Sequence, residues 1–365
     1  MRTELLRARL SALIAESATS EEFSAAVCDL LCQAVPFDYA CLATTDPSTG
    51  LITGVVKTDS GDSADEEFAR YEFGLPDDFL LFADMARRSV PVAVLHAETN
   101  GQPERSRRFR EFLRPRFSHG HELRAVFRAG RQMWGAAGLY RSTGPGGFTQ
   151  TEADLVETIC ELVAVGLRIS LVRGTLSMPP SITGPAAIVV GADNQLRSVT
   201  SAARQRIEEL GGMRWSTLPM TLTAMTAAAR AHQIGGAVVP RARIRTRSGD
   251  WLFAHAAALT TANGHADDVI ITLENAGAPE IVPLIVASFG LTNREEDVAA
   301  LVLQGVDTAG ISQRLHLSPY TVQDHLKSVF VKAGVNSRRE LTAKVFFEQY
   351  APRIGSARGP SGWFA

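Results

Sequence analysis

Residues 291–345 read LTNREEDVAALVLQGVDTAGISQRLHLSPYTVQDHLKSVFVKAGVNSRRELTAKV, and this stretch carries the clearest structural signals of the chain. It contains several helix-start signals, in which a hydroxyl or carboxylate satisfies free backbone N–H groups. Gly334 supplies a left-handed helix end. Four short helices are predicted, the second and third joined by a tight turn, as in a helix-turn-helix. The start signals are Thr292 with Glu295, Asp307, Ser318 before a proline, and Ser337 with Glu340.

The third predicted helix, from Ser318 to about Ala333, has two distinct faces. At about 100° per residue, one face is apolar and suited to a core. The opposite face mixes an amide, a carboxylate, an ammonium, a phenol and a small aliphatic group, which is the chemistry that reads base edges in a major groove. The apolar face consists of Val322, Leu326, Val329, Phe330 and Ala333, and the mixed face of Tyr320, Gln323, Asp324, Lys327 and Val331.

Local charge supports a nucleic-acid surface in this stretch. The whole chain of 365 residues carries 37 Lys+Arg and 39 Asp+Glu, a formal charge of −2. Between Arg314 and Lys344, however, six basic residues face two acidic ones, a difference of +4. Neutralising phosphates requires such a local excess. A polar helix face alone is more often ordinary surface, but the caps and the charge together favour double-stranded DNA as a partner.

The stretch closely resembles the LuxR-type helix-turn-helix over about 55 residues. The matching features are LTxRE at the start, Gly305, the ISxxLxLSxxTVxxHL core from Ile311 to Leu326, and the KxGVxSRxEL ending. The resemblance implies a third helix in the major groove and a fourth helix that commonly supports a dimer on two half-sites. By position it places base contacts on Gln323, Asp324 and Lys327, and phosphate contacts on Ser318, Tyr320, Thr321 and Lys332. The family often has Lys at the position of Gln323, and Asp324 adds a negative charge, which leaves the operator sequence open.

Two stretches rich in Gly and Pro divide the rest of the chain, at Gly174 to Pro185 and at Asn275 to Pro283. Both are interpreted as linkers, because such stretches cannot continue a helix. The predicted domains are residues 1–174, 185–275 and 283–350, followed by a disordered tail, residues 351–365, with few apolar side chains.

Periodicity predicts the secondary structure of the front domains. Helices are expected near Leu5–Ile14 and over 20–34, 150–173 and 201–210. Strands are expected at 39–44, 51–57, 122–128 and 134–140, and then at 187–190, 196–199, 238–247, 251–260 and 269–273.

Residues 1–174 are similar to GAF domains in the strands ELRAVF (122–127) and WGAAGLY (134–140) and in the helix start GFTQTEADL. Residues 185–275 resemble a PAS-like domain more faintly. The predicted fold class is therefore a multidomain α+β chain. GAF-like and PAS-like α/β sensor domains precede an all-α four-helix LuxR-type helix-turn-helix domain.

The helix predicted over 150–173 carries a narrow apolar stripe with alternating steps of four and three residues. Such a stripe suits a partner helix and slightly favours self-association as a homodimer. The alternative is that the stripe packs on the sheet of its own domain. Its members are Leu155, Ile159, Leu162, Gly166 and Ile169.

Four arginines alternate along the strand predicted at 238–247, so their side chains share one face. They could form an anion or partner site, but a solvated face that protects a sheet edge is the favoured interpretation. The four are Arg241, Arg243, Arg245 and Arg247.

Candidate metal and redox sites have simpler explanations. His119, His121 and Glu122 lack the second histidine of a zinc-protease motif, because Ala125 stands there. Loop histidines and small buried cysteines (Cys28, Cys32) are the favoured interpretations. No metal site, no catalytic residue and no cofactor is predicted. Four cysteines without a Cys-x-x-Cys pair form no disulfide framework.

Motif searches also argue against an enzyme. No phosphate-binding loop, dinucleotide fingerprint or nucleophile elbow is present. The N-terminus lacks the apolar core of a signal peptide and no apolar run could span a bilayer, so a cytoplasmic protein without membrane contact is expected. The predicted function is a sequence-specific transcriptional regulator whose front domains sense a small ligand or a partner and control dimeric DNA binding. A ligand-free protein-interaction module remains an alternative, and a small-molecule enzyme with accessory DNA binding a weaker one.

Overall fold

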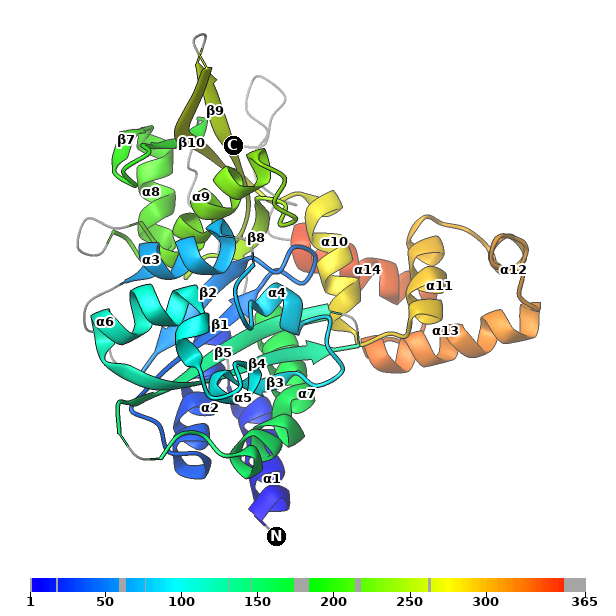
Figure 1. Ribbon diagram of the computed structural model, residues 1–365. Helices are drawn as coiled ribbons and strands as arrows, with labels where there is room; N and C mark the ends of the chain where they lie inside the picture. Colours follow the sequence, from blue (N-terminus) through cyan, green and yellow to red (C-terminus); the bar gives the residue numbers. More distant parts are fainter. Residues whose placement is uncertain are drawn as a thin grey trace. The chain divides into compact units, whose positions relative to one another are not determined.

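The computed structural model describes residues 2–17, 19–58, 64–75, 77–130, 132–144, 146–173, 184–213, 218–261 and 264–350. The described residues form two compact units (Figure 1), one made of residues 2–173 and 184–275 and the other of residues 276–350. The predicted tail, and residues 174–183 of the first predicted linker, lie outside the described residues.

The first half of the first unit is built on an antiparallel five-stranded sheet. The strands are β1 (Tyr39–Thr45), β2 (Ile52–Lys57), β3 (Val92–Val94), β4 (His119–Ala129) and β5 (Gln132–Ser142). Their order is β2-β1-β5-β4-β3. All four predicted strands are present. The sequence did not indicate β3, because three residues are too few to show an alternating pattern.

Helices cover both faces of this sheet. A methyl group added at Gly135 would contact Leu167 of α7, whereas the next residue, Ala136, packs with the short helical segments. Because successive strand residues point to opposite faces, α7 and the short segments cover different sides. The long helices α1 (Arg2–Glu16), α2 (Ser20–Ala34) and α7 (Gln150–Val172) pack together. The short segments are α3 (Asp65–Ala69), η1 (Arg70–Gly74), α4 (Phe82–Met85), α5 (Leu95–Glu98), η2 (Pro103–Arg105), η3 (Phe109–Leu113) and α6 (Arg114–Phe117).

The apolar stripe of α7 is covered in part by the chain itself. Ile159 and Gly166 are buried, and α7 contacts α1, α2 and the sheet. The ring of Phe23 in α2 lies against Gly166, where an added methyl group would be 2.0 Å from its Cζ. Leu155, Leu162 and Ile169 are half-buried. The expected alternative, packing within the same domain, therefore accounts for the buried part of the stripe.

The second half of the first unit repeats the same strand order. Its strands are β6 (Ala186–Val190), β7 (Leu196–Val199), β8 (Arg241–Arg245), β9 (Trp251–Thr261) and β10 (Gly264–Asn275). The order β7-β6-β10-β9-β8 is the second-first-fifth-fourth-third order of the first sheet, and all pairings are again antiparallel. The helices α8 (Ser201–Glu209) and α9 (Met220–Gln233) pack on this sheet. β8 is shorter than the strand predicted over 238–247.

The two sheets share one hydrophobic core. Leu51 and Ile52 of the first half belong to the same buried cluster as Ile188, Met225 and Ile271 of the second half. The helix α9 contacts α3, η1 and β2 of the first half as well as β9 and β10 of its own. The two halves are therefore joined by packing and not only by the covalent chain.

Two of the four arginines, Arg243 and Arg245, differ from the favoured prediction of a solvated face, whereas Arg241 and Arg247 are exposed as predicted. Arg243 donates through Nε and its second guanidinium nitrogen to the buried carboxylate of Asp46, at 2.8 and 2.6 Å. Arg245 donates to the carbonyl groups of Leu171 and Arg173 at the end of α7. The sequence shows that these side chains share one face of the strand. It does not show that residues of the first half of the unit pack against that face. A solvated face is therefore wrong for Arg243, and Arg245 is half-buried.

The second unit contains α10 (Ala278–Ser288), α11 (Asn293–Leu303), α12 (Thr308–Leu315), α13 (Pro319–Ala333) and α14 (Arg338–Tyr350). The second predicted linker is largely wrong, because α10 begins at Ala278 and runs through Pro283. Its start is stabilised by Glu280, whose carboxylate accepts a hydrogen bond from the Gly277 N–H at 2.8 Å. α10 contacts α11 and α14, so a fifth helix joins the four predicted ones. None of the described helices is both long and apolar enough to cross a membrane.

Candidate nucleic-acid interface

The caps predicted from the sequence position α11, α12 and α13. Thr292 and Glu295 form a full capping box on α11. The Asp307 carboxylate accepts from Gly310 N–H at 2.8 Å at the start of α12. Ser318 Oγ accepts from Thr321 N–H at 3.0 Å at the start of α13. Gly334 ends α13 at a φ of 64°.

The start of α14 differs slightly from the prediction. Ser337 Oγ accepts from Glu340 N–H at 3.1 Å, as expected of a capping box. The Glu340 carboxylate, however, accepts from the N–H of Asn336 at 2.8 Å and not from that of Ser337. The side chain of Ser337 and the backbone N–H of Asn336 therefore make the two hydrogen bonds that a capping box normally makes at a single residue.

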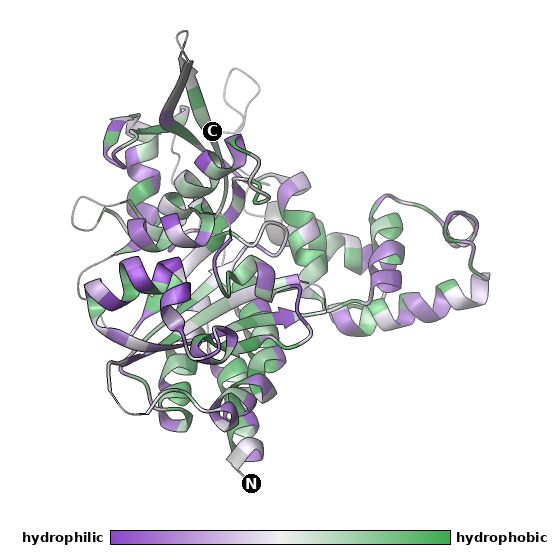
Figure 2. Cartoon of the chain, in the orientation of Figure 1, coloured by the Kyte–Doolittle hydropathy of each residue, from purple (hydrophilic) through white to green (hydrophobic). Residues whose placement is uncertain are grey.

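The apolar face of α13 lies in the core of the unit, as predicted. Val322, Leu326, Val329 and Ala333 are buried, and Phe330 is half-buried. α13 contacts α11, α12 and α14. Figure 2 shows hydrophilic and hydrophobic residues alternating along α13, which is the amphipathic pattern of a helix anchored on one side.

The mixed face of α13 is exposed. Tyr320 and Val331 are 77% and 80% exposed, and Gln323 and Asp324 are exposed as well. The Lys327 side chain is 76% exposed, with Nζ 3.7 Å from Asp324 Oδ1. A surface pair at this distance is weak and releases the ammonium readily. Phenol, amide, carboxylate, ammonium and isopropyl groups thus project together from one helix, as base-edge recognition requires.

Ser318 and Thr321 lie at the first turn of α13, where backbone N–H groups favour an anion. Their hydroxyl oxygens are 2.8 Å apart. Ser318 Oγ already accepts from the Thr321 N–H, and Ser318 is exposed to solvent.

Lys332 lies in a different setting from the other predicted contacts. Its Nζ donates to Glu295 Oε2 at 2.6 Å, and Ser328 Oγ donates to Glu295 Oε1 at 2.5 Å. Glu295 also accepts from Thr292 N–H at 2.7 Å. Burial opposes ionisation of Glu295, but these hydrogen bonds outweigh it and hold its pKa at about 2. Lys332 therefore joins α13 to the start of α11.

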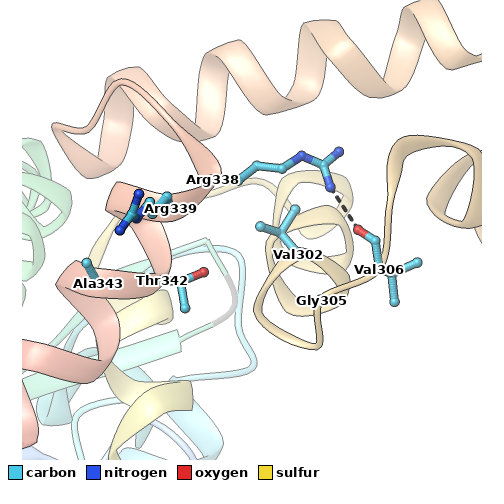
Figure 3. Close-up of a pocket in the computed structure, with 7 residues that line it drawn as sticks. All are labelled: Val302, Gly305, Val306, Arg338, Arg339, Thr342 and Ala343. Atoms are coloured by element: carbon cyan, nitrogen blue, oxygen red, sulfur yellow. Dashed lines mark hydrogen bonds between the residues drawn. The ribbon is translucent and has the colours of Figure 1, made fainter.

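Arg338 has a structural role that the sequence did not single out. Its guanidinium donates to the Val306 carbonyl at 2.8 Å (Figure 3). It also donates to Thr308 Oγ1 at 2.8 Å and so fixes the turn between α11 and α12. Gln323 Nε2 donates to the same Thr308 oxygen at 3.3 Å. From the sequence, Arg338 was expected only to add to the local positive charge. No sequence pattern around it distinguishes a side chain that fixes a turn from one that contacts a phosphate.

A shallow groove of about 540 Å³ lies beside this tether. Figure 3 shows its lining, with the Arg338 guanidinium directed to the Val306 carbonyl and Val302 on the facing helix. Its lining residues are Val302, Gly305, Val306, Arg338, Arg339, Thr342 and Ala343.

The other candidate sites do not come together as a metal centre. His119 and His121 lie in β4, so their placement in a loop is wrong. Cys28 is buried as expected, but Cys32 is exposed. Among the described residues, no group of three or more His, Cys, Asp or Glu side chains could hold a metal ion.

Residues 290–345 match the family described as bacterial regulatory proteins, luxR family. They form a LuxR-family helix-turn-helix domain. HTH-type transcriptional regulators of Mycobacterium bovis and Mycobacterium tuberculosis are 47% identical to the chain over 51 residues, which is 14% of this chain and 6% of each relative. A regulator of Aeromonas salmonicida is 45% identical over 51 residues, 14% of this chain and 26% of the relative. The chain thus matches only a small part of the length of these relatives.

Two solved structures resemble this chain more weakly than the relatives above resemble its LuxR-family domain. Escherichia coli SdiA is 11% identical with a TM-score of 0.32, over 93% of this chain and 94% of that one. The Vibrio cholerae VqmA dimer, a LuxR-type receptor, is 13% identical with a TM-score of 0.22, over 46% of this chain and 85% of that one. TM-scores of this size do not establish a shared fold.

Proposed function

We propose that this protein is a cytoplasmic, sequence-specific transcriptional regulator whose front domains sense a small ligand and control dimeric binding to double-stranded DNA. The observation that carries the proposal is the exposed mixed face of α13 on a LuxR-family domain. An ordinary surface helix usually exposes charged and polar side chains, whereas α13 exposes Tyr320 and Val331 beside a lysine and an amide. No catalytic step and no cofactor form part of the proposal.

The mixed face and the first turn of α13 supply the proposed contacts. Lys327 donates to guanine, Gln323 pairs with adenine and Asp324 accepts from cytosine, as their chemistry allows. Ser318, Tyr320 and Thr321 bind phosphate near the helix start, which favours anions. Lys332 reaches a phosphate only by leaving Glu295.

The front unit is proposed to sense the signal. Two antiparallel sheets with one strand order, each packed with helices, support a GAF-like domain over residues 1–174 and a PAS-like domain over residues 185–275. A cavity of about 50 Å³, lined by aromatic side chains, lies between the first sheet and its covering helices, and a small ligand would need it to enlarge. The ligand would act by shifting the population of two arrangements of the DNA-reading domains.

The dimer is proposed to form through α14, in keeping with the resemblance of the sequence to its family. The half-buried residues of α7 (Leu155, Leu162, Ile169) are proposed as a separate dimer contact within the first unit. Two copies of α13 would then read two half-sites.

The proposal is tested by selecting duplexes from a random pool with the full chain and then measuring affinity for the selected site. We expect Lys327→Ala to weaken binding by about tenfold or more, because a base-edge contact contributes about 1–3 kcal/mol. Arg294→Ala is the matched control: Arg294 is also exposed and pairs with an acid three residues away, at 3.5 Å, but lies on α11. Equal affinities of the two variants would contradict the groove assignment, and failure to enrich any duplex would contradict the function.

A further inference from the structure

Arginines gather on the outer side of one segment of the first unit, residues 104–116. The segment reads ERSRRFREFLRPR and holds six arginines and two glutamates, a difference of +4 in a chain whose formal charge is −2. Arg108 is buried and paired with Glu122, so five exposed arginines face two exposed glutamates. The exposed side of this arginine segment therefore carries an excess of three positive charges.

The inner side of the arginine segment fixes it to the rest of the unit. Asp78 accepts hydrogen bonds from the backbone N–H groups of Arg107 and Arg108, at 3.1 and 2.7 Å. The apolar side chains that point inward belong to a buried hydrophobic cluster, namely Phe109, Phe112 and Leu113. The backbone that carries the arginines is thus already ordered, and an ordered surface loses less entropy when it binds a partner.

Three of the exposed arginines form one contiguous cluster with the two glutamates. Arg107 and Arg110 donate to different oxygens of Glu111, both at 2.9 Å. Arg110 also donates to the Glu104 carbonyl at 2.8 Å, and Arg114 donates to the Glu104 carboxylate at 2.5 Å. The positive charges therefore lie side by side and are not scattered over the surface.

The two glutamates neutralise this cluster only in part. Hydrogen bonds from Arg107 and Arg110 hold the pKa of Glu111 at about 2, so at neutral pH it supplies one negative charge against two positive ones. The side chains of Arg107, Arg110 and Arg114 remain 49%, 50% and 53% exposed. Because a guanidinium has five N–H donors, each of them can donate to a further anion while it keeps its glutamate.

The choice of arginine favours phosphate as that anion. The segment contains no lysine. A planar guanidinium binds phosphate through two parallel hydrogen bonds, which an ammonium cannot do. Phosphates recur about every 3.4 Å of axis along each strand of a duplex, so neighbouring arginines can engage several of them. A protein partner would need a matching acidic surface, whereas the proposed function already brings a duplex to this molecule.

We propose that the arginine segment is a second DNA-binding surface, which holds the phosphate backbone of a duplex without reading its sequence. The inference rests on the proposed function and extends it beyond α13. Contacts to phosphates outside the selected site would add affinity but carry no sequence information. About three phosphates are expected, one for each unit of the exposed positive excess.

The test measures the affinity of the full chain for two duplexes at several salt concentrations. One duplex ends at the selected site, and the other extends it by two helical turns, about 20 base pairs, on each side. The ratio of the two affinities is the flank advantage. With about three additional phosphate contacts, it should fall roughly fortyfold between about 50 and 200 mM salt. The variant Arg107→Gln, Arg110→Gln, Arg114→Gln should lose the flank advantage and keep its affinity for the short duplex.

The control variant removes three exposed arginines elsewhere in the first unit: Arg9→Gln, Arg197→Gln, Arg204→Gln. Arg197 is 52% exposed and pairs with an aspartate at 2.9 Å, much as the cluster arginines pair with glutamates. Both variants lose the same net charge, so they differ only in where it is lost. The control should retain the flank advantage.

Glu104→Gln gives an independent measurement, because it removes a negative charge from the cluster and leaves every arginine in place. It should steepen the dependence of the logarithm of the flank advantage on the logarithm of the salt concentration by about 0.9, the effect of one more phosphate contact. A slope that did not change in Glu104→Gln would contradict the proposal even if the triple variant failed to fold.

Three other results would overturn the inference. The first is an equal loss of flank advantage in the two arginine variants, and the second is a flank advantage that survives in the cluster variant. The third is competition by polyglutamate as effective as that by an unrelated duplex, since the surface would then suit an acidic protein. Binding of the short duplex without a flank advantage rejects the arginine surface alone, whereas failure to bind the short duplex rejects the proposed function.

Discussion

At the scale of single residues, Glu295 has more hydrogen-bond partners than a capping residue needs. Its carboxylate, with a pKa of about 2 against an ordinary 4.5, contributes stability that is complete above about pH 5 and is lost as the pH falls toward 2. We expect Glu295→Gln to lower the free energy of unfolding by about 1–2 kcal/mol at pH 7, because the Lys332 ammonium loses its partner. The variant should also show a weaker loss of stability on acidification. Urea titrations at pH 7 and pH 3.5 measure both effects.

The neighbouring Glu296 serves as the control. Burial raises its pKa, the opposite direction, so its charge does not stabilise the fold at pH 7. Glu296→Gln should leave the free energy of unfolding at pH 7 unchanged or slightly higher. If both variants lost the same stability, the hydrogen bonds of Glu295 would have no special role.

At the scale of elements, Gly166 shows how packing can outweigh helix propensity. Replacing a helical glycine with alanine usually stabilises a protein by about 1 kcal/mol. In α7 the new methyl group would lie 2.0 Å from Cζ of Phe23, so the two helices would have to separate. We expect Gly166→Ala to destabilise the protein by about 1–3 kcal/mol, measured by thermal unfolding. The double variant with Phe23→Leu should recover part of the loss, and a stabilised single variant would show that α2 does not pack as described.

At the scale of the whole molecule, the pair of Arg243 and Asp46 joins the two halves of the first unit. The Arg243 backbone N–H also donates to Asp46, at 2.8 Å. Removing one partner of a buried pair leaves an uncompensated charge, so Arg243→Met should cost about 3–5 kcal/mol. Calorimetry on the full chain should show a lower unfolding temperature for this unit. Arg197→Met removes an exposed pair with Asp193 in the same half and should change stability by less than about 1 kcal/mol. If the two variants lost similar amounts of stability, the pair of Arg243 and Asp46 would not be what holds the two sheets together.

The sequence predicted features that depend on local spacing and missed those that depend on distant partners. The caps of α11 to α13 and both faces of α13 follow from residues within one or two turns of each other. By contrast, Glu122 and Arg124 lie fully buried in β4, and Arg124 is paired at 2.6 Å with Glu72, 52 residues away. No local pattern predicts such a pair, or that Lys332 binds Glu295.

The tethering of cations in the second unit has a consequence for how DNA would be held. Lys332, Arg338 and Lys344 all donate to acceptors within their own unit, the last to the Ala333 carbonyl at 2.8 Å. Half of the six basic side chains that raise the local charge therefore help to maintain the fold, but only Lys332 is neutralised by a carboxylate, so about one condensed counterion fewer would be expelled from a duplex when it is engaged. Complex formation should consequently be slightly less sensitive to rising ionic strength than six free cations would make it.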